Sequence, residues 1–232
     1  MAHLSDPEKA VLFLHVYLVN NWRSISERIL RSAPHKVVIV HLCYERSWPF
    51  TLFLARRFFK RFPNVRYVLE SVNNISSPEV AGFRKMLAEV SLNDYEVLTY
   101  MHAKGVTKPR NQNIRDWVEL MRHFHTDRFD LISDVFGQGY ALYGVNLATY
   151  AKGAERYGPF QFSDFHYSGN FVSVNLEKLR DKLYSIPVDE GYFGLEGYWG
   201  KLCDVSAAFC AHLSSTHIKN HYLEAYPSTL YR

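Results

Sequence analysis

The sequence predicts an α/β fold built on a mostly parallel sheet. In its first half, short apolar segments of strand length alternate with segments whose apolar residues recur at helical spacing. The strand segments are continuously apolar, which is typical of parallel strands buried on both faces. A chain of 232 residues is long enough to bury such a core. We therefore expect a sheet with helices packed on both sides.

Each element of the first half follows from its own pattern. Four strands are expected, over 11–19, 35–44, 65–71 and 95–102. Three helices are expected between them, over 20–32, 48–62 and 76–92. Pro49 falls in the first turn of the second helix, where proline is tolerated. The third helix begins with Ser77 and Pro78, a common helix start.

The second half is less regular, and we expect it to extend the same domain. A long helix is expected over 113–136, followed by strands within 140–150 and 160–175. Two further helices are expected over 176–186 and 190–203. No internal repeat and no low-complexity linker divides the chain. A single domain over 1–232 is therefore predicted.

The charge balance is mildly basic, with 27 Lys and Arg against 23 Asp and Glu and a formal net charge of +4. This permits an anionic ligand but lacks the strongly basic stripe expected of a nucleic-acid-binding protein. The densest basic stretch, 55–66, alternates basic and apolar residues and predicts the solvent face of an amphipathic helix. Docking on an acidic surface, a membrane surface or a nucleic acid is the alternative.

The cysteines indicate a reducing compartment, and the apolar run near the start of the chain indicates neither a membrane span nor a signal peptide. Cys43, Cys203 and Cys210 are odd in number and form no CxxC pair, so neither a disulfide framework nor a zinc knuckle is indicated. The apolar run 10–19 is shorter than the roughly 20 residues that a membrane span needs. It also lacks the basic start and cleavage site of a signal peptide. We expect a cytoplasmic protein without a transmembrane segment.

Polar residues follow each of the four predicted parallel strands. The carboxyl ends of such strands meet at one edge of the sheet, where ligands of open α/β sheets bind. The segments expected to converge there are 17–21, 43–46, 71–74 and 102–107. The fourth strand runs directly into His102, Lys104 and Gly105. A lysine ammonium beside an imidazole suits a phosphate, and glycine permits close backbone approach. A surface turn with a solvated lysine is the alternative.

The segment "DFHYSGNF" (164–171) places polar residues at alternate positions. These residues are Asp164, His166, Ser168 and Asn170. In an extended strand all four would share one face, and Gly169 would mark a close approach. We expect this face to contact a bound ligand, with an ordinary solvent face as the alternative. A serine hydrolase is not indicated, because the G-x-S-x-G turn is missing.

Four motifs occur in a characteristic order: "HVYLVNNW", "YMHAKGVT", "YGVN" and "FHYSGNF". In this order, over nearly the whole chain, they resemble a family of viral and bacterial glycosyltransferase-like proteins, with H-x-K-G and S-G-N-F as the specific elements. That family is similar to the GT-A class. The resemblance implies one GT-A-like α/β/α sandwich with a Rossmann-like first half. About 10–110 would bind the nucleotide sugar, and about 111–232 the sugar and acceptor.

One departure from the GT-A pattern affects the metal prediction. Such enzymes carry an Asp-x-Asp metal motif at the end of the fourth strand, where this chain has His102-Ala103-Lys104. The departing nucleoside diphosphate gains negative charge, which a bound Mg²⁺ or Mn²⁺ or a lysine with an imidazole N–H can stabilise. No metal ligand is therefore predicted, and a Mn²⁺ or Mg²⁺ cofactor stays open. The histidine pairs 123/125 and 217/221 lack a completing carboxylate or thiol.

The resemblance also implies individual roles. Tyr17 and Asn20 would lie near the nucleoside, and His102, Lys104 and Gly105 at the diphosphate. Residues 166–170 would surround the transferred sugar and contact the acceptor. Glu196, within "GYFGLEGYWG", would be the general base that deprotonates the acceptor, with Asp164 as second candidate. A carboxylate on a helix surface is the alternative for Glu196. Trp199 would stack on an acceptor sugar or pack in the core.

Together these features predict a glycosyltransferase. It would move a sugar from a nucleotide diphosphosugar, UDP in preference to GDP, to a hydroxyl of a glycan or glycoprotein acceptor. The alternative is a non-catalytic nucleotide- or glycan-binding module of the same fold. No nucleic-acid partner is expected. The donor sugar, the acceptor, the stereochemistry and the oligomeric state do not follow from the sequence.

Overall fold

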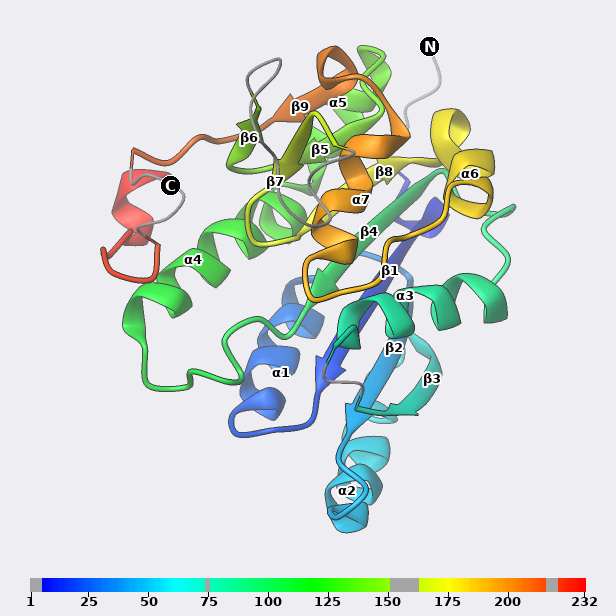
Figure 1. Ribbon diagram of the computed structural model, residues 1–232, viewed down its shortest axis with the longest axis vertical. Coiled ribbons are helices and arrows are strands. Elements are labelled where there is room, and N and C mark those ends of the chain that lie inside the picture. The colour runs from blue at the N-terminus through cyan, green and yellow to red at the C-terminus, as the bar shows by residue number, and fades with distance from the viewer. Residues whose placement is uncertain (1–5, 74–75, 151–162, 216–220) are drawn as a thin grey trace.

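The computed structural model describes residues 6–73, 76–150, 163–215 and 221–232, and it is built on a seven-stranded sheet of order β3-β2-β1-β4-β8-β5-β9 (Figure 1). The strands are β1 (Ala10–Tyr17), β2 (Val37–Tyr44), β3 (Val65–Val72), β4 (Val97–His102), β5 (Leu142–Gly144), β8 (Val172–Asn175) and β9 (Ala208–Cys210). The first four are mutually parallel. β8 is antiparallel to both β4 and β5, and β9 is parallel to β5.

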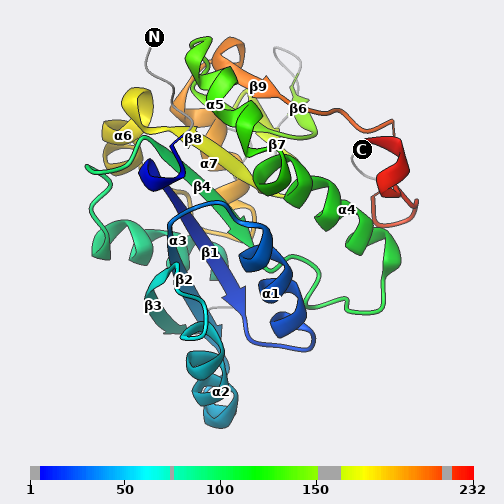
Figure 2. The same ribbon diagram turned by 180° about the vertical axis from the view of Figure 1, so that it is seen from behind.

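Helices cover both faces of this sheet. α3 (Pro78–Glu89), α6 (Leu176–Ser185) and α7 (Gly194–Leu202) lie toward the viewer in Figure 1. α1 (Trp22–Ser32), α4 (Gln112–Arg122) and α5 (Phe129–Gly137) cover the opposite face, as Figure 2 shows, and α2 (Pro49–Phe59) packs into the same core cluster. The predicted fold class, an α/β/α sandwich with a mostly parallel sheet, is confirmed.

The continuous apolar character of β1 reflects burial on both faces. Leu12 and Leu14 pack into the core shared with α1, α2 and α4. Val11 and Phe13 point to the other side, into the core shared with α3, α6 and α7. Because successive side chains of a strand alternate between faces, a strand covered on both sides needs apolar residues at every position.

The expected helix over 113–136 is interrupted. α4 ends at Arg122, a wide turn spans His123–Asp127, and α5 begins at Phe129. Arg122 donates to both carboxylate oxygens of Asp127, at 2.6 and 3.0 Å, and Thr126 Oγ1 donates to the Arg122 carbonyl at 2.8 Å. These bonds stabilise the wide turn, a form that is found as a bulge within α-helices.

The expected extended face over 164–170 is also wrong in its second half. The strand β7 spans only Phe165–Tyr167, and it pairs with β6 (Leu147–Thr149) in a separate two-stranded sheet. The chain then turns, because Gly169 and Asn170 adopt φ values of +95° and +60°. Within the described residues, no helix combines the length and the apolar character needed to cross a membrane.

Candidate functional site

The carboxyl ends of the four parallel strands converge on a cavity of about 450 Å³, which we call the edge cavity. Its walls include Tyr17 at the end of β1, Glu45 after β2, Asn73 after β3, and Lys104 after β4. Tyr17 Oη donates to Glu45 Oε1 at 2.5 Å, and Asn73 Nδ2 donates to the same oxygen at 2.8 Å. Burial and the hydrogen bond to Glu45 raise the pKa of Tyr17 to about 12, so its hydroxyl keeps its proton.

A second cavity of about 520 Å³, which we call the inner cavity, adjoins the first. Its walls add side chains from the second half of the chain, namely Trp117, Tyr150, His166, Ser168, Asn170 and Glu196. The two cavities share the residues Glu79, His102, Lys104, Tyr192 and Tyr222. The volumes lie in the range typical of small-molecule sites. Together they form a site that extends from the strand ends to α7.

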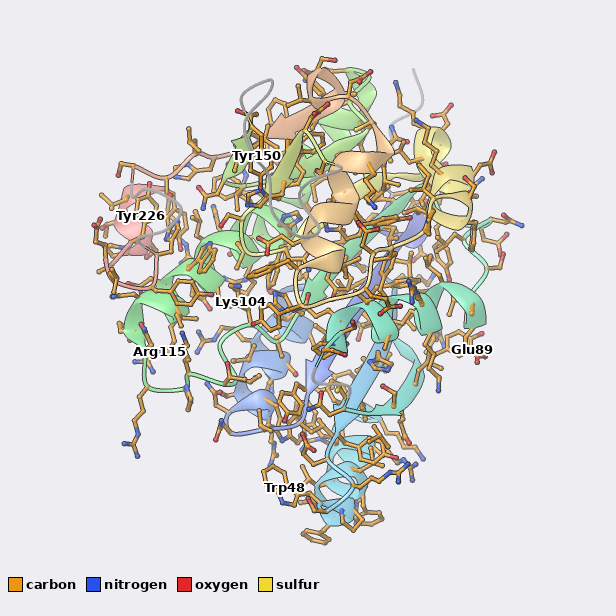
Figure 3. All side chains as sticks on the ribbon, viewed as in Figure 1. Trp48, Glu89, Lys104, Arg115, Tyr150 and Tyr226 are labelled. Atoms are coloured by element: carbon orange, nitrogen blue, oxygen red, sulfur yellow. The ribbon has the colours of Figure 1, made fainter. Side chains whose placement is uncertain are left out.

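Lys104 lines both cavities and so occupies their junction. Figure 3 labels its side chain. Its Nζ lies 4.3 Å from the centroid of the Trp117 ring, a cation–π contact. The Trp117 ring in turn stacks on His221, with ring centroids 4.9 Å apart. No ion pair joins Lys104 to a carboxylate within the part of the chain described, although Glu79 and Glu196 are near enough for its charge to act on them. The ammonium is therefore available to an anionic ligand.

Gly105 shapes the turn beside Lys104. Its backbone φ of +88° is a value that residues other than glycine rarely adopt. A Cβ at this position would lie 2.9 Å from Ile114 Cγ2 on α4. The glycine therefore lets the loop after β4 lie directly against α4 while Lys104 reaches the cavities.

His102 is held by acceptors on both sides of its ring. Nδ1 lies 2.8 Å from Glu79 Oε1, and Nε2 donates to the Gly169 carbonyl at 3.0 Å. Both bonds need an N–H, so this geometry is satisfied by the imidazolium. Burial alone would raise the pKa of Glu79, but the charge and hydrogen bond of His102, together with His15 and Lys104, bring it down to about 2. Both N–H groups of His102 are thus used by the protein, and its charge is paired with that of Glu79.

Glu196 lies in the wall of the inner cavity near the start of α7. Its Oε1 accepts the Gly169 N–H at 3.1 Å and lies 4.0 Å from His166 Nε2. Burial raises the pKa of Glu196, against the opposing effects of Lys104 and the Gly169 N–H. Burial also lowers the pKa of His166 to about 4, and its Nδ1 is 2.7 Å from Tyr150 Oη. A carboxylate of raised proton affinity at a cavity wall is suited to accept a proton from a bound hydroxyl.

Asn170 is oriented by two hydrogen bonds. Its Nδ2 donates to Glu79 Oε2 at 2.6 Å, and its Oδ1 accepts the Trp199 indole N–H at 2.6 Å. Trp199 itself is fully buried and packs against Phe83 and Tyr100. Trp199 therefore lies in the core, which was one of its two expected positions. From there its indole N–H orients Asn170.

Asn20 and Asp164 do not line either cavity. Asn20 is exposed, adopts a φ of +49°, and donates from Nδ2 to the Val106 carbonyl at 2.7 Å. It therefore ties the loop after β1 to the loop after β4. Asp164 is exposed just before β7, and its carbonyl accepts the Tyr150 N–H at 3.1 Å. The other predicted residues that line the edge cavity or the inner cavity are Tyr17, His102, Lys104, Gly105, His166, Ser168, Asn170 and Glu196. Gly169 lines neither cavity, and its backbone bonds to His102 and Glu196.

Glu79 and Trp117 belong to the site but are not indicated by the sequence patterns. Glu79 follows Pro78 in the first turn of α3, where an acidic residue is ordinarily explained by the helix dipole. Trp117 falls on the apolar stripe of α4. The usable signal for Glu79 is topological: α3 follows a parallel strand, so its first turn lies at the ligand-binding edge.

The described residues do not form a metal site, since they contain no group of three or more His, Cys, Asp and Glu side chains placed to hold an ion. Both oxygens of Glu79 are already bonded, to His102 and Asn170. His221 Nε2 is hydrogen-bonded to Ser214 Oγ and to Asn146 Nδ2, at 2.8 and 3.1 Å. His217 lies outside the described residues. These donors do not fit a divalent cation.

A broader groove of about 1230 Å³ lies at the opposite edge of the sheet. Its cationic side chains are engaged by the protein itself: Lys9 pairs with Glu96, Lys178 donates to the Gly139 carbonyl, and Arg180 donates to the Tyr95 carbonyl. Because ligands of open α/β sheets bind at the carboxyl ends of the strands, we assign the site to the edge and inner cavities.

No protein-family model and no curated protein matches this sequence. Solved structures that are similar to this chain include the following two, each at 11% sequence identity. A mannosyltransferase, PcManGT from Pyrobaculum calidifontis, in complex with GDP-Man and Mn²⁺, has a TM-score of 0.48 over 91% of this chain. S. aureus TarS 1–349, in complex with UDP-GlcNAc, has a TM-score of 0.42 over 83% of this chain. The chain matches 59% and 52% of the lengths of these two chains.

Proposed function

We propose that this protein is a glycosyltransferase that moves a sugar from a nucleotide diphosphosugar to a hydroxyl of a glycan acceptor. The observation that carries the proposal is the position of Lys104, whose ammonium lies where the edge cavity and the inner cavity meet. In this arrangement the nucleoside lies in the edge cavity, the diphosphate faces Lys104, and the transferred sugar enters the inner cavity. Residues of about 10–110 then serve the nucleotide, and about 111–232 serve the sugar and the acceptor.

The part of the edge cavity proposed to hold the nucleoside is lined by polar side chains that are already hydrogen-bonded to one another. Tyr17, Glu45 and Asn73 form a connected set of donors and acceptors that a base or ribose can join. Such polar groups orient a ligand within a pocket. UDP-sugars are the first donors to test, followed by GDP-sugars.

Lys104 stabilises the leaving group in the proposed reaction. When the bond between the anomeric carbon and the diphosphate oxygen breaks, the diphosphate gains negative charge while the sugar becomes oxocarbenium-like. A charge-assisted hydrogen bond from Lys104 contributes about 1.5–3 kcal/mol, or roughly ten- to hundredfold in rate when it forms mainly in the transition state. His102 contributes by position, because its two ring nitrogens join Glu79 and the Gly169 carbonyl beside Lys104.

Glu196 is the proposed general base. The acceptor hydroxyl transfers its proton to the Glu196 carboxylate as its oxygen bonds to the anomeric carbon and the diphosphate departs. His166, Ser168 and Asn170 line the same cavity and are proposed to contact the sugar and the acceptor. Tyr192 presents an exposed ring at the junction, suited to stacking on a sugar.

A donor screen tests the proposal. Thermal shift is measured with UDP- and GDP-sugars, with and without Mn²⁺, because a ligand at 100 times its Kd stabilises a protein by about 2.7 kcal/mol. The released sugar and nucleoside diphosphate are then quantified. Stabilisation by a nucleotide sugar with sugar release supports the transferase. Stabilisation without release indicates a binding module of the same fold, and no stabilisation by any donor contradicts the proposal.

A further inference from the structure

The outer face of α2 is unusually apolar. Phe50, Phe53 and Leu54 fall at helical spacing on this face, with exposed fractions of 69%, 50% and 44%. Trp48, immediately before the helix, is 49% exposed. We call these four side chains the α2 patch. The rings of Phe50 and Phe53 stack, with centroids 6.4 Å apart, so the patch is continuous along the helix.

The patch is additional to the face that α2 packs against the protein. Leu52, Ala55 and Phe59 on the inner side are buried in the core, and Phe58 lies edge-on to Trp22 of α1. A surface helix ordinarily has one apolar stripe and a polar opposite face. α2 has apolar residues on two faces along its first two turns, and packing against the core explains only the inner face.

Cationic side chains follow the patch on the same helix and just beyond it. Arg57 holds its guanidinium 5.9 Å from the centroid of Phe53, and Arg61 lies 5.0 Å from that of Phe58. Arg56 differs, because both of its bonds go to the Glu70 carboxylate, at 2.5 and 2.6 Å. Lys60 is exposed beside them. The basic stretch is therefore a solvent face, as expected, but it borders an exposed aromatic surface.

We propose that the α2 patch docks on an anionic lipid bilayer. Trp and Phe side chains partition into the boundary between headgroups and acyl chains, and flanking Arg and Lys pair with anionic headgroups. The shape supports a bilayer over a protein groove: α2 projects from the body at one end of the molecule (Figure 1), and Trp48 lies at this outer end (Figure 3). The edge cavity, the inner cavity and the broader groove at the opposite edge of the sheet include no patch residue.

The positive charge beside the α2 patch also favours an anionic bilayer over a second copy of the chain. Arg57, Lys60 and Arg61 would face equal charges if two patches met across a two-fold axis, whereas anionic headgroups complement them. The inference does not depend on the proposed transferase activity, because it rests on the surface of α2 alone.

Vesicle co-sedimentation tests the proposal with the full chain. We expect the protein to sediment with phosphatidylcholine vesicles that contain phosphatidylglycerol, and much less with phosphatidylcholine alone or at high salt. The double variant Phe50→Ser/Phe53→Ser should weaken binding on the order of tenfold for each ring removed. Arg57→Gln/Lys60→Gln should weaken it about fivefold for each charge. All four positions are exposed, so the thermal unfolding midpoint should stay unchanged.

Matched variants elsewhere on the surface control for general effects. Tyr184→Ser removes an exposed aromatic ring from α6, and Arg31→Gln/Arg128→Gln removes two exposed charges from other elements. These variants should bind anionic vesicles as the unmodified protein does. Absence of sedimentation with anionic vesicles, or equal binding by the patch variants and the controls, would overturn the proposal. So would sedimentation velocity showing that the patch instead joins two copies.

Discussion

Glu79 Oε1 lies 2.8 Å from Nδ1 of His102, so the first turn of α3 is joined to the end of β4 at the centre of the candidate site. The other nitrogen of His102 donates to the Gly169 carbonyl, and the other oxygen of Glu79 accepts from Asn170. One ion pair therefore fixes the turn that carries the inner-cavity residues relative to the parallel strands. Because both partners are largely buried, the pair is expected to govern both stability and the shape of the site.

Replacing Glu79 with Gln should destabilise the protein at neutral pH. The folded pKa of Glu79 is about 2 against an ordinary 4.5, so the ionised carboxylate stabilises the folded state by about 3 kcal/mol above pH 4.5. This contribution is lost as the pH falls from 4.5 toward 2. In urea denaturation at pH 7, the variant should therefore have a much lower free energy of unfolding than the unmodified protein. At pH 3 this difference should be smaller. Glu89→Gln, at the exposed end of the same helix, is the control. Equal loss of stability in the two variants would refute this role of the pair.

Replacing Glu196 with Gln should abolish proton acceptance while leaving the donor bound. We expect kcat to fall by roughly 10²–10⁴ and the Kd for the donor to change little. Since burial raises the pKa of Glu196, activity should decline as the pH is lowered through that raised value, where the base becomes protonated. Steady-state kinetics and a pH–rate profile test this. Asp164→Asn, at the exposed position outside both cavities, should be nearly as active as the unmodified protein. If it instead shows the larger loss, Asp164 is the base.

Acid should destabilise the protein through its buried neutral histidines. His15 and His41 lie in register on β1 and β2, with their Nδ1 atoms 3.1 Å apart, and burial is the main cause that lowers their pKa values to about 4 and about 3. The unfolded chain binds these protons near pH 6.5, so the free energy of unfolding should fall as the pH drops below that value. Each histidine contributes about 1.4 kcal/mol per pH unit until its folded pKa is reached.

His41→Gln isolates this effect. As the pH falls from 6 to 4, the free energy of unfolding should decrease less steeply in the variant than in the unmodified protein. The two slopes should differ by about 1.4 kcal/mol per pH unit. Urea denaturation at a series of pH values measures the slope, with an unchanged m value as the check on unfolding. Parallel slopes in the two proteins would show that His41 takes up no proton on unfolding.

The strands and the position of Lys104 were predictable because each depends on local pattern and on topology. A continuously apolar strand such as β1 indicates burial on both faces, and residues that follow parallel strands meet at one edge. The break between α4 and α5 was not predictable, since the turn combines local bonds from Arg122 to Asp127 with a long-range contact between Thr126 Oγ1 and Ser32 Oγ of α1, at 3.0 Å. Glu79 was missed for a similar reason: an acid in a first helical turn has a local explanation that conceals its long-range partner.

Donor binding and turnover of Lys104→Ala test the central claim most directly. If the ammonium at the junction of the two cavities holds the diphosphate, the variant should bind nucleotide sugar more weakly, and its kcat/KM for transfer should fall by roughly ten- to hundredfold. Lys178→Ala, at the opposite edge of the sheet, should match the unmodified protein in both measurements. Nucleotide-sugar binding and turnover that are unchanged in Lys104→Ala would contradict the account.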